Sequence, residues 1–129
     1  MIPTPSTPAT ASFTHSPVKA SHVIGRDVVN PKGENLGDIK EVMLDPGTGR
    51  IVYAVVAFGG FLGMGDKLFA VPFSAFAYDD EQEEYVLDVP KEQLKNAPGF
   101  DAAAWPSMAG EQWNRDVYSY YGAAPYWEN

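Results

Sequence analysis

The 129-residue sequence contains no cysteine, and this absence removes several kinds of chemistry at once. Without cysteine there is no disulfide, no thiolate ligand for zinc and no thiol nucleophile. Histidine is almost as scarce, because only His15 and His22 are present and both lie at or before the start of the expected fold. A Ser-His-Asp triad and a three-histidine metal site therefore find no support, and we predict no catalytic residue, no metal and no cofactor.

The sequence also lacks a long apolar run. No stretch approaches the roughly 18 consecutive apolar residues of a membrane-spanning helix, and the longest run, residues 51–58, has the length of a strand. Residues 1–20 are rich in Pro, Thr and Ser and lack the basic start and apolar core of a secretory signal. We therefore expect a cytoplasmic protein without a transmembrane segment, in which residues 1–20 form a flexible tail.

Basic residues are outnumbered, with 9 Lys and Arg against 17 Asp and Glu and a formal net charge of -8. All of the acidic residues lie beyond residue 26, so the folded part should repel phosphate backbones and anionic lipid headgroups. Direct nucleic-acid binding is therefore not expected. The charge either serves solubility alone or favours a basic protein partner.

What the sequence does contain is a series of short apolar runs separated by Gly, Pro, Asn and Asp. This pattern is typical of brief strands joined by turns, and it predicts an all-β domain over residues 21–97. The expected strands lie near residues 23–29, 36–44, 51–58, 67–71, 76–78 and 85–89. A short helix should follow from Pro90, with Leu94 as its inward anchor.

The second of these strands is irregular. Strict alternation cannot place Ile39 on the same face as Val42 and Leu44. We therefore predict a β-bulge near Lys40-Glu41, which would sharpen the curvature that a small closed barrel requires.

The third strand is apolar on both faces. Ile51, Tyr53, Val55 and Ala57 alternate with Val52, Ala54, Val56 and Phe58. Antiparallel strands that face water usually carry polar residues at every second position, and a small barrel has only one interior. The outer face should therefore be covered by the C-terminal segment, by a second subunit or by another partner.

The Gly-rich segment at residues 59–67 resembles a phosphate-binding loop only superficially. A P-loop needs Gly-Lys followed by Ser or Thr and then a helix, whereas here Asp66 interrupts the pattern and a strand follows. The glycines instead predict a sharp connection between two strands. In that connection Phe61, Leu62 and Met64 either plug their own barrel or project as a docking knob.

The acidic turn at residues 79–84 could hold a hard cation through its carboxylates. It lacks the glycine and the fixed ligand spacing of an EF-hand loop, so a solvated hairpin end is the favoured interpretation. Nothing in a barrel this small indicates the cleft that paired carboxylates would need for glycoside hydrolysis.

Residues 98–129 are expected to form an aromatic-rich, partly helical C-terminal segment. Four of its residues share the i, i+4, i+7, i+8 spacing of one helical face: Trp113, Val117, Tyr120 and Tyr121. This spacing predicts a helix over residues 110–121, which packs on the barrel or on a second subunit. Stacking on nucleic-acid bases is disfavoured, because only Arg115 lies nearby to attract phosphate. The candidate interaction residues of the chain are Phe61, Leu62, Met64, Trp105, Trp113, Tyr120, Tyr121 and Trp127.

Several of these stretches together resemble the PRC-barrel domain family. They are Ile24-Gly25-Arg26-Asp27-Val28, Gly33-Glu34-Asn35-Leu36-Gly37-Asp38-Ile39, Asp45, Gly59-Gly60-Phe61-Leu62-Gly63-Met64-Gly65-Asp66-Lys67 and Val71-Pro72-Phe73-Ser74. The resemblance covers about residues 21–97. Its most specific part is the double-Gly loop that leads into a strand and a Pro-aromatic-Ser corner, where Phe73 stands in place of the Trp of many relatives.

The resemblance implies a small six-stranded PRC-type β-barrel. Such barrels are found in the cytoplasmic part of the photosynthetic reaction-centre H subunit, in a bacterial ribosome maturation factor and in stand-alone bacterial proteins, none of which uses the barrel as an enzyme. We therefore expect a non-enzymatic protein-interaction or assembly module that forms a homodimer and binds an unidentified protein. Two alternatives are a ribosome- or RNA-processing-associated factor that acts through a basic protein partner, and an accessory protein related to the reaction centre.

Overall fold

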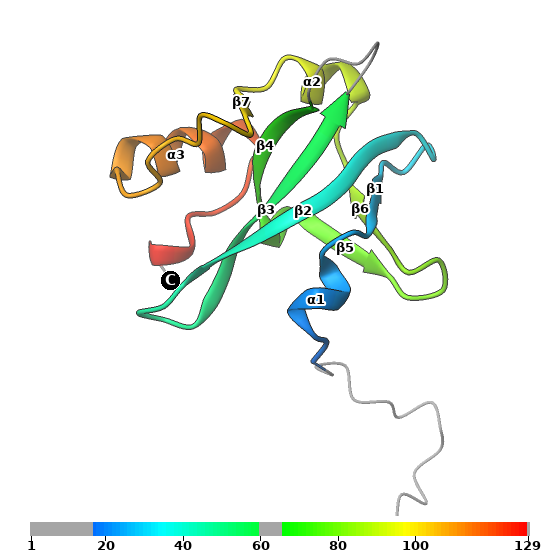
Figure 1. Cartoon of the computed structure of the whole chain (residues 1–129), viewed down its shortest axis with the longest axis horizontal. Coiled ribbons are helices and arrows are strands. Elements are labelled where there is room, and N and C mark those ends of the chain that lie inside the picture. Colours follow the sequence, from blue (N-terminus) through cyan, green and yellow to red (C-terminus); the bar gives the residue numbers. More distant parts are fainter. Residues whose placement is uncertain (1–16, 60–65, 129) are drawn as a thin grey trace, which may run out of the picture.

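The structure, a computed structural model, describes residues 17–59 and 66–128. Seven strands form one mixed sheet in the order β5-β6-β1-β2-β3-β4-β7, which coils around a central core (Figure 1). The strands are β1 Asp27–Val29, β2 Asn35–Asp45, β3 Arg50–Gly59, β4 Asp66–Pro72, β5 Phe76–Asp79, β6 Glu84–Leu87 and β7 Phe100–Asp101. Neighbouring strands are antiparallel, except that β1 and β6 are parallel.

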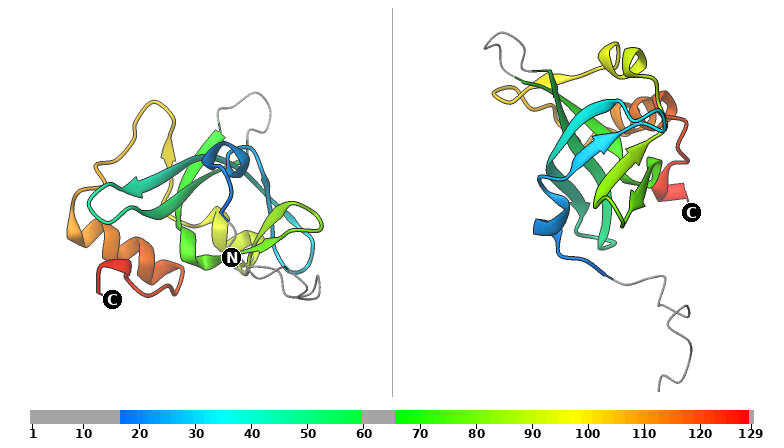
Figure 2. Two further views of the ribbon diagram at one scale, coloured as in Figure 1. Left: turned by 90° about the horizontal axis from the view of Figure 1, so that it is seen from below. Right: turned by 90° about the vertical axis from the view of Figure 1, so that its right-hand side faces the viewer.

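Short helices connect and cover the strands. They are α1 Ala20–Val23, the 3₁₀ turn η2 Phe73–Ala75, α2 Lys91–Lys95, α3 Glu111–Tyr120 and the 3₁₀ turn η3 Tyr126–Glu128. The sequence predicted both α2 and α3, and the buried side chain of Leu94 confirms the inward anchor of α2. Figure 2 shows α3 and η3 on the outside of the sheet, away from α1.

The structure confirms the all-β class but not the six-stranded closed barrel. The six predicted strands correspond to β1–β6, and the two-residue strand β7 adds a seventh beside β4. Because β6 pairs with β1, the β5–β6 hairpin lies beyond β1 and leaves β5 at one edge of the sheet. Among the described residues no pairing joins that edge to β7 at the other.

The start of the first strand was placed too early. Val23 belongs to α1, because the backbone N–H of Ile24 donates to the carbonyl of Ala20 at 3.1 Å and closes a helical turn. Strand β1 begins at Asp27. The side chain of Val23 is nevertheless buried, so its apolar character reflects packing under the sheet rather than strand geometry.

The predicted β-bulge is present in β2. The register against β3 shifts between Ile39 and Glu41, and this shift turns Ile39 fully into the core while Val42 packs against the same cluster. A second shift follows between Met43 and Leu44 and leaves Leu44 58% exposed. The prediction that Leu44 shares the inner face was therefore wrong.

Strand β2 also passes very close to β3 at Gly37. A Cβ atom at this position would overlap the carbonyl oxygen of Ala57, and the backbone has φ +125°. Only glycine accommodates both the close approach and this φ value without strain.

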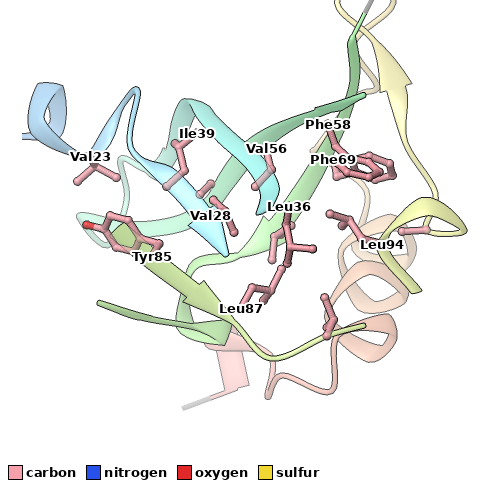
Figure 3. Close-up of a cluster of buried hydrophobic side chains, with 14 residues drawn as sticks. Val23, Val28, Leu36, Ile39, Val56, Phe58, Phe69, Tyr85, Leu87 and Leu94 are labelled. Carbon is pink, nitrogen blue, oxygen red and sulfur yellow. The ribbon is translucent and has the colours of Figure 1, made fainter. Parts of the chain in front are cut away.

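An inner cluster fills the concave side of the sheet (Figure 3). Its buried members are Val23, Val28, Leu36, Ile39, Ala54, Val56, Phe58, Phe69, Val71, Tyr85, Leu87, Val89, Leu94 and Ala97. They come from α1, α2 and all of the strands except β5 and β7, so the helices close the two ends of the core. All of its buried members lie within the predicted all-β domain, residues 21–97.

The convex side of the sheet carries two further clusters. The outer cluster consists of Val52, Tyr53, Ala70, Val117 and Tyr118, and a smaller one consists of Val55, Ala57 and Leu68. Residues of α3 and the partly buried Phe100 thus cover the outer face of β3. Val52, which strict alternation placed with Ala54, packs in the outer cluster because the C-terminal segment wraps around this end of the strand. The face therefore requires no second subunit to cover it.

Candidate functional site

The C-terminal segment is fixed to β3 by two tyrosine hydroxyl groups. The hydroxyl of Tyr118 donates to the backbone carbonyl of Val52 at 3.0 Å, and that of Tyr53 donates to Oδ1 of Asn114. The amide nitrogen of Asn114 in turn donates to the carbonyls of Met108 and Gly110. Burial raises the pKa of Tyr118 to about 12 and also raises that of Tyr53, so both stay protonated donors at neutral pH.

Aromatic rings surround Tyr118 on three sides. Its ring centroid lies 5.5 Å from that of Tyr53, 5.4 Å from that of Trp127 and 6.1 Å from that of Tyr126. Trp113 meets Tyr53 edge-on at 5.6 Å. Edge-to-face pairs of this kind add to the stabilisation that burial alone provides.

A charged group holds the last turn of the chain. The guanidinium of Arg115 lies 5.6 Å from the ring centroid of Trp127 and forms ion pairs with Glu111 at 2.7 Å and Glu128 at 2.8 Å. Nε1 of Trp127 is buried and has no hydrogen-bond partner among the described residues.

The β2–β3 hairpin is tied to the same turn. The hydroxyl of Tyr126 donates to Oδ2 of Asp45 at 3.0 Å, and Nη1 of Arg50 donates to the carbonyl of Tyr126 at 2.9 Å. The backbone N–H of Gly47 and then this phenol lower the pKa of Asp45, since both donate to its charged form.

A groove of about 740 Å³ lies between the C-terminal segment, η2 and the end of β6. Its lining residues include the aromatic residues Phe73, Tyr118, Tyr121 and Tyr126, and Arg50 and Asp88 add charge of both signs. The hydroxyl of Tyr121 is buried without a hydrogen-bond partner among the described residues. Burial raises the pKa of Tyr121, so this group is a protonated donor whose acceptor is not supplied by the described part of the chain.

The neighbouring Tyr120 is used differently. Its hydroxyl donates to the backbone carbonyl of Gln93 at 2.6 Å and ties α3 to the segment of α2. Tyr120 and Tyr121 also contact each other, with ring centroids 5.2 Å apart. The hydroxyl of Tyr120 therefore has an acceptor within the fold, whereas that of Tyr121 has none among the described residues.

The structure brings together four of the predicted interaction residues and leaves the others elsewhere. Trp113, Tyr120, Tyr121 and Trp127 all lie in the C-terminal segment where it packs on the sheet. Trp105 lies apart, 40% exposed, with its ring centroid 5.0 Å from that of Phe100 beside a separate cavity near Lys40 and Leu68. Three further candidates, Phe61, Leu62 and Met64, fall outside the described residues.

Tyr118 is expected to be buried with the other aromatic residues of the segment but is not among the candidate interaction residues, although it is the most buried aromatic residue there. Its side chain is 2% exposed and forms the centre of the outer cluster. The predicted helical face rests on Trp113 and Val117, which are both apolar. A second stripe, Asn114, Tyr118 and Tyr121, has i, i+4, i+7 spacing, but the polar Asn114 at its head concealed it.

Titratable residues elsewhere form surface contacts. Nη2 of Arg26 donates to Nδ1 of His22 at 3.0 Å, and Nη1 of Arg26 lies 3.5 Å from Oε1 of Glu83. In the acidic turn, Oδ1 of Asp79 accepts from the backbone N–H groups of Glu81 and Gln82. Within residues 17–59 and 66–128 no group of three or more His, Asp or Glu side chains is placed to hold a metal ion.

The helices are short. In the part of the chain that the structure describes, every helix is too short or too polar to cross a bilayer. The two longest, α3 and α2, both pack against the sheet.

Comparison with known proteins identifies the domain. A family model described as the PRC-barrel domain matches residues 18–94, which is more than half of the chain. No curated protein matches the sequence. The matched region contains β1–β6 and most of α2, whereas β7, α3 and η3 lie beyond it, so the groove has one wall inside the matched region and one outside it. The chain belongs to the PRC-barrel domain family.

Proposed function

We propose that this PRC-barrel protein is a non-enzymatic interaction or assembly module that binds its partner in the groove beside the C-terminal segment. The single observation that carries the proposal is the groove itself, whose lining combines the aromatic residues Phe73, Tyr121 and Tyr126 with the charged residues Arg50 and Asp88. The family match favours the same class of function.

The chemistry of the groove favours binding over catalysis. Its walls are mostly aromatic and aliphatic, and the guanidinium of Arg50 is engaged by the carbonyl of Tyr126. A few charged groups among aromatic and aliphatic side chains are typical of recognition sites, in which polar groups fix orientation and rings supply buried area.

The proposed homodimer rests on another surface. The outer face of β3 is already covered, but Leu44 and Ile51 are cross-strand neighbours at the end of the β2–β3 hairpin and are 58% and 36% exposed. Ile51 also lines the groove, so a second subunit on this pair would lie next to the partner site. Sedimentation of the wild type and of the Leu44→Asp variant tests this: we expect a dimer that becomes a monomer, and a monomeric wild type would contradict it.

The groove itself is tested by blocking it. Ala124 is exposed and lines the groove, so Ala124→Arg places a bulky charge there without disturbing a buried side chain. Ala109 is also exposed but lies in the loop before α3, and Ala109→Arg is the matched control. We expect the wild type and Ala109→Arg to retain a partner protein from an extract of the producing cells. Ala124→Arg should fail to retain it. Equal retention by all three would contradict a groove-bound partner.

A further inference from the structure

The aromatic groove has the chemistry that recognises an extended proline-rich peptide. Such peptides form polyproline II helices, which dock against aromatic rings and expose carbonyls that accept hydrogen bonds. Phe73 and Tyr126, which are partly exposed, line the groove and supply ring surfaces. This inference rests on the proposed function, because it concerns the occupant of the same groove.

The chain itself carries a peptide of this composition. Residues 1–16 contain Pro3, Pro5 and Pro8, of which the last two have the spacing Pro-x-x-Pro. Each proline lacks an N–H, so the backbone there offers mainly carbonyl acceptors. The same 16 residues contain no Asp or Glu and so meet no like-charge repulsion from a chain whose formal net charge is -8.

The attachment point allows the segment to reach the groove. Helix α1 begins three residues after Pro17, and Nε2 of His22 in α1 lies 3.4 Å from the hydroxyl of Tyr78 in β5. From the backbone of Tyr78 to Ala75 of η2, which lines the groove, is three residues of chain, or at most about 10 Å, to which the length of the Tyr78 side chain is added. Residues 9–19, which join the proline-rich stretch to α1, can span up to about 35 Å, which exceeds this path.

We propose that the proline-rich stretch at residues 3–8 of the chain's own N-terminal segment occupies the groove. The rings of Phe73 and Tyr126 pack on its prolines. Tethering gives the segment an effective concentration on the order of millimolar, so a weak contact suffices to fill the groove. A protein partner then binds by displacing the segment, which makes residues 1–16 a competitor built into the module.

The absence of cysteine makes a direct test possible in the full-length chain. Thr10→Cys creates a single thiol that carries a nitroxide label just after the proline-rich stretch. We expect the label to broaden the amide signals of Ala75, Gly122 and Ala124 and to leave those of the distant turn at Lys32 sharp. Full signal intensity at the groove would overturn the proposal.

Two variants and one mixture define the contact further. Replacing Pro3, Pro5 and Pro8 together by Ala, or introducing Ala124→Arg, should restore the groove signals, and broadening that survives both would overturn the assignment. Broadening in an unlabelled chain mixed with a nitroxide-labelled one would place the segment in the groove of a second copy and would overturn docking within one chain. Loss of partner retention in Ala124→Arg without nitroxide broadening leaves the proposed function standing and removes this inference. Nitroxide broadening at the groove, with partner retention unchanged in Ala124→Arg, leaves this inference standing and removes the proposed function.

Discussion

The inner and outer clusters share strand β3 but are built on different principles. The inner cluster consists almost entirely of hydrocarbon side chains, whereas the outer one is organised around the phenols of Tyr53 and Tyr118. Hydrocarbon packing requires only burial and shape, but each buried phenol must also find an acceptor. Tyr53 and Tyr118 find theirs within the fold, and Tyr121 does not among the described residues. The inner cluster therefore depends on burial and shape alone, whereas the aromatic side also depends on the pairing of each buried phenol.

The largest test of this comparison removes the outer side altogether. Truncation after Ala97 deletes α3 and exposes apolar side chains of β3 and β4, among them Tyr53, Val55 and Ala70. We expect lost solubility or a changed oligomeric state, because an uncovered apolar sheet face associates. Sedimentation and a solubility assay measure this. A monomer with an unchanged melting temperature would show that the inner cluster alone makes a complete domain.

A substitution that creates a large cavity tests the inner cluster. Phe69 is fully buried, and Phe69→Ala should lower the free energy of unfolding by about 3–5 kcal/mol. Urea denaturation gives the value. Trp105→Ala is the matched control, since its side chain is 40% exposed and its removal should cost much less. Equal losses for the two variants would contradict the assignment of the core.

Two conservative variants separate a satisfied phenol from one without a partner. Tyr118→Phe removes the hydrogen bond to the carbonyl of Val52 and should cost about 0.5–1.5 kcal/mol of stability. Tyr121→Phe removes a hydroxyl that has no acceptor among the described residues, so the unfolding free energy should stay the same or rise slightly. Urea denaturation of both variants decides this. A larger loss for Tyr121→Phe would mean that its hydroxyl is paired within the chain.

The smallest expected effect is a pH dependence at the hairpin. The pKa of Asp45 lies below its ordinary value of 3.8 in the folded protein, so its charged form stabilises the fold above that value. This contribution is lost as the pH falls through the folded pKa. Denaturation midpoints should therefore drop less below pH 3.8 in Asp45→Asn than in the wild type. An equal drop in the two denaturation midpoints would show that the charge of the carboxylate adds nothing to its hydrogen bond with Tyr126.

Features that depend on neighbouring residues in the sequence could be predicted. The bulge beside Ile39 follows from a break in alternation, and α3 follows from apolar spacing around Val117. The inward position of Leu94 follows from a short helix that opens after proline. Each of these signals lies within one element, where the periods of strand and helix act directly on the pattern.

Features that depend on distant packing could not be predicted. Strand β7 has two residues and exists because Phe100 and Asp101 reach the edge of β4. The exposure of Leu44 follows from a second register shift against β3, and the burial of Tyr118 follows from its contact with Val52. Residues far apart in the sequence line the groove. Its charged residues, Arg50 and Asp88, carry no local sequence signal that predicts their proximity.

The parallel pairing of β1 and β6 has a consequence for how the chain folds. It joins Val28 to Tyr85 across most of the domain, whereas the β2–β3–β4 meander is made of strands adjacent in sequence. Contacts between residues far apart in sequence close large loops and form slowly. We therefore expect the meander to form in the transition state and the docking of the β5–β6 hairpin onto β1 to complete the domain late. Substitutions at Tyr85 would then speed unfolding more than they slow folding.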